Sequence, residues 1–166
     1  MLVVTDSTII NGKLSRVFDC FWDPTLWPQI TPHVKQIEMI EWEDTHQRFK
    51  MSVEANGKRH DMETERIAVI NERITYRQSQ PPPFFDEHIG EWLFEELDEG
   101  VRVTLIHKAR INEPKAREIL EVGSLAEAEV LISETLKRNG RLTMSAVKAT
   151  IEGDMAASEA GVGGQL

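Results

Sequence analysis

Hydrophobic and polar residues alternate along residues 101–111 (VRVTLIHKARI), with Ile106 as the one apolar exception on the polar side. Alternation with a period of two is typical of a β-strand that has one buried face and one face in water. The hydrophobic face of this predicted strand contains a single polar side chain, His107. A polar group among buried positions needs a hydrogen-bonding partner or a function, so the rest of the chain is considered in relation to it.

A second strand is predicted between the prolines at residues 81–83 and a turn at residues 98–100. One face carries three glutamates and three apolar residues, namely Glu87, Glu91, Glu95, Ile89, Leu93 and Leu97. The opposite face carries His88, Gly90, Trp92 and Phe94. The two strands together predict a sheet whose inner face is aromatic and contains two histidines.

Five further strands are predicted from β-branched residues, alternation and turn signals. A hairpin covers residues 34–55, and the Asn-Gly pair that follows it is the strongest hairpin signal in the sequence. Because the links after the first strand are short, the sheet is predicted to be antiparallel. In chain order these strands are residues 2–10, the two arms of the hairpin, residues 58–69 and residues 73–80.

The strand at residues 58–69 carries acidic side chains on one of its faces. If those acids face water, Arg66 faces inward together with Thr64 and Met62. The next strand adds Tyr76 and Gln78, whose side chains combine an apolar body with a polar tip. The predicted interior is therefore unusually polar for a hydrophobic core.

Four helical segments are predicted around this sheet. Two short helices, at about residues 15–22 and 23–30, follow the first strand and are kept short by prolines. A short helix or lid is expected at residues 115–122, and hydrophobic residues at helical spacing predict a long helix from residue 125 to about residue 152. Residues 153–166 are small and polar, and we expect them to be a disordered tail.

This order of elements predicts an α+β fold with a seven-stranded curved antiparallel sheet wrapped around one long C-terminal helix, and two short helices after the first strand. We assign residues 1–152 to this single domain. A sheet that curves around one helix commonly leaves a cavity between them, so we expect an internal cavity.

Composition limits the partners that the chain can have. The 166 residues carry a net charge of −9, which argues against a general binder of nucleic acid. An acidic protein partner remains open, because a local basic patch is conceivable; the alternative is that these charges are scattered and solvated. The residues of this possible patch are Lys58, Arg59, Arg110, Lys115 and Arg117.

Neither a membrane segment nor a cofactor is expected. No apolar run approaches the roughly 20 residues that span a bilayer, and the N-terminus has no basic region of the kind that begins a secretory signal. We therefore expect a cytoplasmic protein. A single cysteine and five histidines without ligand spacing predict no metal site, and no glycine-rich phosphate loop is present.

Several segments together resemble a known family. They are TDSTIIN, FWDPTLWP followed by PHVKQIEMIEW, the ETER strand, and HIGEWLFEELDEGVRVTLIHKARI. Over about residues 3–152 the chain resembles the aromatase/cyclase proteins of bacterial aromatic polyketide synthesis, which belong to the START-like, helix-grip (SRPBCC) superfamily. Lipid- and quinone-binding relatives share the same layout.

The resemblance implies an internal pocket that holds a poly-β-ketone delivered by an acyl carrier protein of a polyketide synthase. It implies a regiospecific intramolecular aldol cyclisation and a dehydration, in antibiotic biosynthesis, without metal or redox cofactor. The inward arginine of the family corresponds to Arg66, and a polar residue on its last strand corresponds to His107. A pocket tyrosine of some members is replaced here by Val34. The oligomeric state implied is a monomer or a homodimer.

Under this hypothesis Arg66 polarises a ketone and holds the developing oxyanion, while His107 moves protons. Each residue also has a purely structural interpretation. Arg66 could pair with a carboxylate of the long helix, Glu129 or Glu134, and His107 could be a hydrogen-bonded core histidine. The residues expected to contact substrate are Thr64, Tyr76, Gln78, His88, Trp92, Phe94, Phe49, Met51, Met62 and Val34.

The alternative function is a non-catalytic carrier of a hydrophobic ligand such as a quinone, a lipid or an aromatic polyketide. A carrier would be expected to have a drier pocket than the polar inward set described above. The two hypotheses predict different results for replacement of Arg66: loss of turnover with the fold retained in an enzyme, and a change of affinity alone in a carrier.

Overall fold

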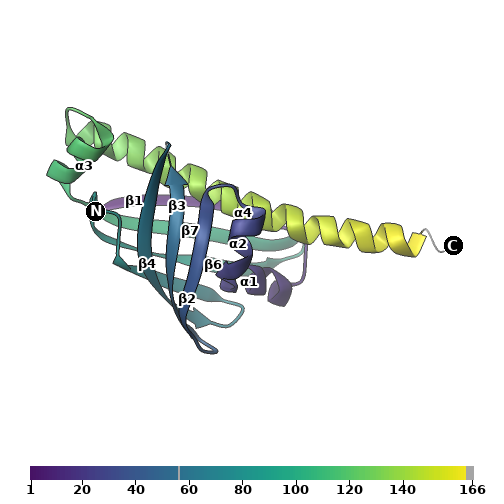
Figure 1. Ribbon diagram of the computed structural model, residues 1–166. Coiled ribbons are helices and arrows are strands. Elements are labelled where there is room, and N and C mark those ends of the chain that lie inside the picture. The colour runs from purple at the N-terminus through teal and green to yellow at the C-terminus, as the bar shows by residue number, and fades with distance from the viewer. Residues whose placement is uncertain (56, 164–166) are drawn as a thin grey trace.

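The computed structural model describes residues 1–55 and 57–163, with side chains described as far as Asp154 (Figure 1). Seven strands form one sheet, and the helices lie at its ends and across its concave face. The strands are β1 (Leu2–Ile10), β2 (Val34–Trp42), β3 (His46–Ala55), β4 (Lys58–Val69), β5 (Arg73–Gln80), β6 (Phe85–Leu97) and β7 (Gly100–Ile111). The helices are α1 (Leu14–Trp22), the 3-10 turn η1 (Pro24–Leu26), α2 (Trp27–Ile30), α3 (Glu113–Leu120) and α4 (Leu125–Gly163).

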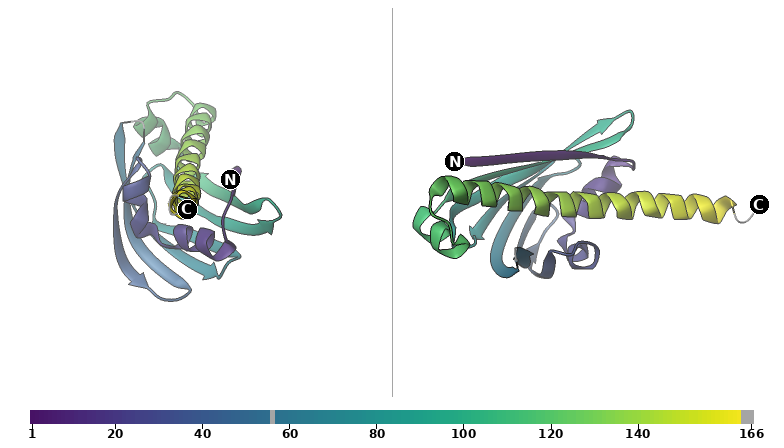
Figure 2. Two further views of the ribbon diagram at one scale, coloured as in Figure 1. Left: turned by 90° about the vertical axis from the view of Figure 1, so that its right-hand side faces the viewer. Right: turned by 90° about the horizontal axis from the view of Figure 1, so that it is seen from above.

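The sheet has the strand order β1-β7-β6-β5-β4-β3-β2, and all neighbouring strands are antiparallel. It curves around α4, as the view along the helix shows (Figure 2). The predicted seven-stranded curved antiparallel sheet around one long helix is therefore confirmed. The two predicted short helices are present after β1, with η1 as an additional turn between them.

The period-two pattern predicted the sheet's inner face correctly. On β7, Val101, Val103, Leu105 and Ala109 are buried, whereas Arg102 and Lys108 are exposed. On β4, Arg66 is inward and only 2% exposed. Because β-strand side chains alternate between faces, one correctly assigned position places the whole strand.

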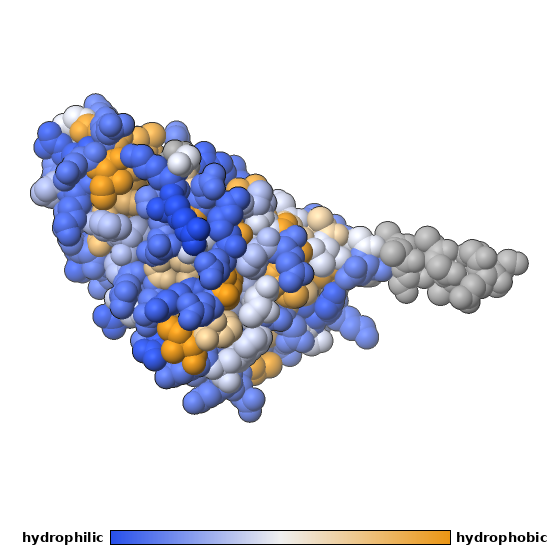
Figure 3. Space-filling model, in the orientation of Figure 1, coloured by the Kyte–Doolittle hydropathy of each residue, from blue (hydrophilic) through white to orange (hydrophobic). Residues whose placement is uncertain are grey.

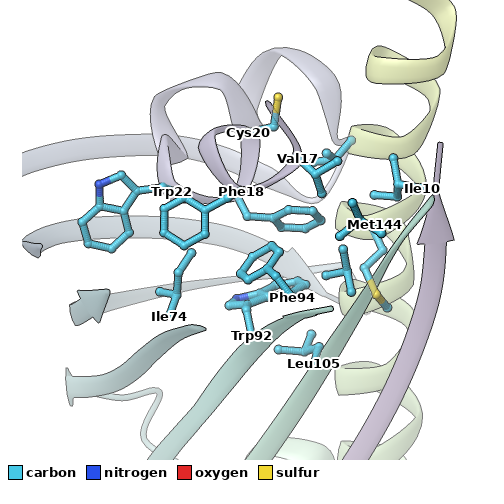
Figure 4. Packing of buried hydrophobic residues seen from close by; sticks show 14 of the residues in the cluster. Ile10, Val17, Phe18, Cys20, Trp22, Ile74, Trp92, Phe94, Leu105 and Met144 are labelled. Atoms are coloured by element: carbon cyan, nitrogen blue, oxygen red, sulfur yellow. The ribbon is translucent and has the colours of Figure 1, made fainter. Parts of the chain in front are cut away.

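Helix α1 closes one end of the curved sheet through aromatic packing (Figure 4). Phe18 and Phe21 lie edge-on or tilted to Phe94 and Trp92 of β6, with ring centroids 4.8–5.6 Å apart. Such pairs contribute beyond simple area burial, by about 1 kcal/mol each. This packing fixes where the last turn of α1 meets the sheet.

Helix α4 begins where the hydroxyl of Ser124 accepts a hydrogen bond from the Glu127 backbone N–H, at 3.2 Å. It continues to Gly163, so the predicted end near residue 152 is wrong and the predicted disorder of residues 153–163 is replaced by helix. The sequence there, GDMAASEAGVG, has no proline to interrupt the helix, but its three glycines and its lack of hydrophobic periodicity gave no signal that the helix continues. Residues 164–166 lie outside the described residues.

Helix α3 packs against α4 at the other end of the sheet, and this second hydrophobic cluster includes Phe84, Ala116 and Ile132. The outer surface seen in Figure 3 is mostly hydrophilic, with hydrophobic patches near α3 and toward the lower ends of β2–β4. Among the described residues, no helix has the length and apolarity to cross a bilayer.

Candidate active site

An internal cavity lies between the inner face of the sheet and α4. The centres of water-sized molecules can occupy about 150 Å³ of it, and its whole empty volume, including open solvent at the mouth, is about 1100 Å³. Strands β3 to β7 supply most of the wall, and Gly140 and Asn139 of α4 lie opposite. The predicted site residues that line it are Val34, Phe49, Met51, Met62, Thr64, Arg66, Tyr76, Gln78, His88, Trp92 and His107.

Arg66 lies at the wall formed by β3, β4 and the end of α1, and its guanidinium is bound to protein atoms. Nη1 donates to the carbonyl of Phe21 at 2.9 Å, and Nη2 donates to the carbonyl of Trp22 at 2.6 Å. Nε and Nη2 also donate to Oε1 of Gln47, at 3.1 and 2.6 Å. Arg66 thus satisfies two carbonyls in the last turn of α1, which have no partners within the helix.

Aromatic rings enclose the same guanidinium. Its central carbon lies 5.0–5.4 Å from the ring centroids of Trp22, Trp27 and Phe49. Burial lowers the pKa of Arg66 to about 9, and the charge of Asp23 opposes that shift. The side chain therefore remains a cation at neutral pH, stabilised by carbonyl oxygens and aromatic faces.

The structural alternative for Arg66 was correct in kind but wrong in its partners. Glu129 and Glu134 are exposed on α4, and the partners are backbone carbonyls and Gln47. Four hydrogen bonds leave at most one of the five N–H groups of an arginine for a ligand. The catalytic role of Arg66 stays a prediction, and its geometry favours holding α1 against the sheet.

His107 belongs to a hydrogen-bonded network on β5, β6 and β7. Its Nδ1 lies 2.6 Å from the hydroxyl of Tyr76 and 3.1 Å from Nε2 of His88. The Tyr76 hydroxyl is also 3.3 Å from Nε2 of His88. His88 Nδ1 contacts Oε1 of Gln78 at 2.8 Å, and Gln78 Nε2 donates to the sulfur of Met62 at 2.8 Å. The network thus joins five predicted site residues from four strands.

Gly90 makes this network possible. It lies between Tyr76 and His107 in the strand pairing. A Cβ at Gly90 would lie 2.5 Å from the Tyr76 hydroxyl oxygen and 2.1 Å from the carbonyl oxygen of Ile106. The absence of a side chain therefore lets the tyrosine cross over β6 to reach His107.

Nε2 of His107 is buried and has no hydrogen-bonding partner within the described part of the chain. Gly140 of α4 faces it, since a Cβ there would lie 3.8 Å from this nitrogen. Burial lowers the pKa of His107 to about 4 and that of His88 to about 3, and His107 lowers the latter further. Both rings are therefore neutral at physiological pH, and burial raises the pKa of Tyr76.

Thr64 supplies a second polar atom at the cavity wall. Its hydroxyl is buried and lacks a hydrogen-bonding partner among the described residues. Unpaired buried polar atoms are uncommon in proteins and often belong to a ligand site. The cavity thus offers two unsatisfied polar atoms, one on β4 and one on β7.

One predicted contact residue is not at the cavity. Phe94 packs in the core against Phe18 and Phe21, so α1 covers it. It shares the inner face of β6 with His88, but it lies further along the strand, where the cavity has ended. The alternation of a strand indicates which face of the sheet a side chain lies on, but it does not indicate whether a helix covers that side chain.

Sequence analysis did not assign several polar residues of the site. His33 lines the cavity, with Nδ1 2.8 Å from the Thr31 hydroxyl and Nε2 3.5 Å from the Thr143 hydroxyl. Burial lowers its pKa to about 4. Gln47 is fully buried as the partner of Arg66. The inward face of β3 could have indicated Gln47, but His33 lies outside any strand or helix and had no periodic signal.

No group of three or more metal-binding side chains occurs in the described part of the chain. What the site offers is a neutral imidazole whose free nitrogen borders an apolar cavity, held by a tyrosine and a second histidine. Such a group can accept a proton from a bound substrate and return it, although its pKa of about 4 makes it a weaker base than an ordinary histidine.

The curated proteins similar to this chain include two polyketide synthase cyclase/dehydratases. The chain is 27% identical over 143 residues to the granaticin polyketide synthase bifunctional cyclase/dehydratase of Streptomyces virginiae, covering 85% of this chain and 47% of that protein. It is 29% identical over 131 residues to the actinorhodin polyketide synthase bifunctional cyclase/dehydratase of Streptomyces coelicolor, covering 72% of this chain and 40% of that protein. The chain thus spans about half the length of the curated relatives it matches, or less.

Solved structures agree. The di-domain ARO/CYC StfQ from the steffimycin biosynthetic pathway superposes with a TM-score of 0.85 at 27% identity, covering 93% of this chain and 53% of that one. The Zhui aromatase/cyclase of a Streptomyces species shares the fold, with a TM-score of 0.81 at 20% identity over 90% of this chain and 93% of that one. The model of the family described as polyketide cyclase/dehydrase and lipid transport matches residues 10–156. The chain therefore belongs to the polyketide cyclase/dehydrase and lipid transport family.

Proposed function

We propose that this protein is a polyketide aromatase/cyclase. It catalyses a regiospecific intramolecular aldol cyclisation and dehydration of a poly-β-ketone bound to an acyl carrier protein. Family membership and the names of the relatives support the reaction class. The mostly apolar lining of the cavity supports a substrate that is a carbon chain.

The observation that carries the proposal is the unpartnered Nε2 of His107 at the cavity wall. A neutral imidazole there removes a proton from a methylene group between two ketones, which is acidic enough for a modest base. The resulting enolate carbon forms a bond to a ketone carbon further along the chain, and the alkoxide so formed takes the proton back. Loss of a second methylene proton and of the hydroxyl as water, followed by enolisation of the ketones that remain in the ring, then yields the aromatic ring.

The neutral state of His107 suits this task. A protonated histidine could not act as the base, and its pKa of about 4 keeps it unprotonated at neutral pH. Tyr76, 2.6 Å from Nδ1, stabilises the imidazolium that forms transiently. On the opposite wall of the cavity, the Thr64 hydroxyl donates a hydrogen bond to a ketone oxygen of the substrate. This contact limits how the polyketide chain can fold.

Delivery of the substrate involves a transient contact with an acyl carrier protein of a polyketide synthase. The Lys58 ammonium donates to the carbonyl of Ile119 at 2.7 Å, which brings β4 beside α3. Ile119 is next to Leu120, which lines the cavity, so this contact places the Lys58 cation near the cavity wall. A cation there would suit an acidic carrier protein.

The test is product analysis by mass spectrometry with a minimal polyketide synthase, run without this protein, with the wild type and with His107→Gln. We expect the wild type to convert shunt products into one cyclised, dehydrated species, and His107→Gln to reduce its rate by about 10²–10⁴-fold. Melting temperatures of both proteins show whether the variant is folded.

Identical products in all three reactions, over several chain lengths, would overturn the proposal. The non-catalytic carrier would then be the better description of this cavity. Fluorescence titration with quinones and aromatic polyketides, following quenching of Trp27 and Trp92 at the cavity wall, would measure that binding directly.

A further inference from the structure

We infer that Gln78, oriented by the sulfur of Met62, is a positioning residue that sets the tautomer of His107. In this tautomer the proton is on Nδ1 and the lone pair of Nε2 faces the cavity. The inference rests on the proposed function for its catalytic meaning, but the protonation pattern itself follows from the hydrogen-bonded network.

The orientation of the Gln78 amide is the first step. Its Nε2 lies 2.8 Å from Sδ of Met62. A thioether sulfur has no proton to donate and acts only as a weak acceptor. The amide group facing it must therefore be the NH₂, because the amide oxygen would place two sets of lone pairs against each other. This orientation directs Oε1 of Gln78 toward His88.

The second step is the tautomer of His88. Oε1 of Gln78 can only accept, so Nδ1 of His88 carries a proton and donates it across 2.8 Å. Burial keeps the His88 ring neutral, as its pKa of about 3 shows. A neutral imidazole has one proton, so Nε2 of His88 is an acceptor.

The third step passes through Tyr76. Its hydroxyl oxygen lies 3.3 Å from Nε2 of His88 and 2.6 Å from Nδ1 of His107. If Tyr76 donates to His88 and accepts from Nδ1–H of His107, every donor in the network has an acceptor. In the reverse arrangement Nδ1 of His107 and Nε2 of His88 would both be unprotonated, with their lone pairs 3.1 Å apart. The first arrangement is therefore favoured.

The consequence appears at the cavity. With its proton on Nδ1, His107 has an unprotonated Nε2, which is the atom without a partner in the described residues. A proton-accepting nitrogen is what the proposed first step requires. Met62 and Gln78 do not reach this atom, so their influence is exerted through His88 and Tyr76.

The direct test is NMR of the full chain with histidines labelled with the heavy nitrogen isotope, at neutral pH and without substrate. Protonated and unprotonated ring nitrogens give well-separated signals, and His107→Gln and His88→Gln assign them. We expect protonated Nδ1 and unprotonated Nε2 in both rings. A protonated Nε2 on His107 would overturn the inference, whatever the activity of the enzyme.

Variants of Gln78 test whether this residue sets the tautomers of His88 and His107. Gln78→Leu removes the acceptor, so the signals of both rings should change to a mixture of tautomers, with kcat about tenfold lower and KM little changed. Gln78→Glu keeps an acceptor for Nδ1–H of His88 and should retain the wild-type tautomer. Gln80→Leu, two residues along β5 and exposed, is the matched control and should alter neither property.

The experiments distinguish failure of the positioning role of Gln78 from failure of the proposed cyclase function. An unchanged histidine spectrum in Gln78→Leu overturns the positioning role even if the protein is a cyclase. The expected spectra with no cyclised product from the wild type would overturn the proposed function and leave Gln78 as a residue that sets a tautomer without a reaction to serve.

Discussion

Two buried polar clusters face the same cavity from opposite parts of the sheet, and they differ in how completely they are satisfied. On β4, the guanidinium of Arg66 donates four hydrogen bonds, which go to Phe21, Trp22 and Gln47. On β7, His107 is held through Nδ1 alone, and its Nε2 has no partner in the described structure. Both are polar residues on a hydrophobic face, and strand periodicity identifies them equally well.

This difference shows how a structural residue can be distinguished from a catalytic candidate. A buried group whose donors all meet protein acceptors contributes to the fold, and removing it leaves those acceptors unpaired. A buried group with one atom left open to a cavity can act on a ligand without breaking existing contacts. By this criterion Arg66 supports the wall, and His107 is the better candidate for proton transfer.

The largest expected effect comes from breaking the first cluster. Arg66→Ala removes the donor to the Phe21 carbonyl and to Gln47 Oε1 and leaves a cavity, whereas the Trp22 carbonyl keeps the hydrogen bond from Gln47 Nε2. We expect a loss of about 3–5 kcal/mol in the free energy of unfolding, measured by urea denaturation. Arg102→Ala, which removes only a surface ion pair with Glu95, should cost less than about 1 kcal/mol. A fully stable Arg66→Ala that has lost activity would restore the catalytic interpretation of Arg66.

The second cluster can be broken without touching its polar residues. Gly90→Ala places a methyl group against the Tyr76 hydroxyl and the Ile106 carbonyl, so we expect about 1–3 kcal/mol of destabilisation and a displaced tyrosine. Cyclase activity should fall toward that of His107→Gln. The control is Gly153→Ala, where a Cβ meets nothing within 4 Å and helix stability should rise. Wild-type activity in Gly90→Ala would show that the contact between Tyr76 and His107 is dispensable.

Acid should distinguish the clusters, because only the second contains side chains that take up protons between pH 7 and 4 when the chain unfolds. The pKa of His107 falls from 6.5 to about 4 on folding, so the unfolded chain binds the proton first. Stability is therefore complete above about pH 6.5 and is lost as the pH falls toward 4, with His88 and His33 contributing in the same direction. Urea denaturation at about pH 7 and pH 5 measures this loss.

The corresponding control is His88→Gln combined with His107→Gln, which should flatten part of this dependence and leave the shares of His33 and His60, whose pKa values burial also lowers. A double variant that loses stability with acid as steeply as the wild type would show that the network does not bind fewer protons in the folded state. Activity of the wild type should likewise decline only as the pH approaches 4, where His107 becomes protonated.

The smallest expected effect concerns Thr64. Thr64→Val keeps the shape and removes a hydroxyl that has no partner among the described residues, so the free energy of unfolding should change by less than about 1 kcal/mol. If the hydroxyl binds a ketone, KM should rise about tenfold with kcat nearly unchanged. Thr104→Val on the outer face of β7 is the matched control. An unchanged KM in Thr64→Val would show that the Thr64 hydroxyl does not bind the substrate, and would leave the cavity wall at His107 as the place of polar contact.

The strands were predictable nearly to the residue, because a half-buried strand must alternate and a tight turn must use residues such as Asn-Gly or Glu-Gly. The end of α4 was not, since it extends beyond the sheet, where no burial pattern marks it. The candidate site was predicted as a set of inward residues. Their roles were not, because alternation says which way a side chain points and nothing about what it meets.

What the sequence by itself determined is the element order, the inner face of each strand and the presence of Arg66, His88 and His107 on it. Only the tertiary structure decided that α1 brings its carbonyls to Arg66, that Gly90 lets Tyr76 reach His107, and that α1 covers Phe94. The physical reason is the separation along the chain over which each effect acts. Periodicity arises from each strand's own geometry, whereas the satisfaction of a buried polar group depends on atoms that come from distant parts of the chain.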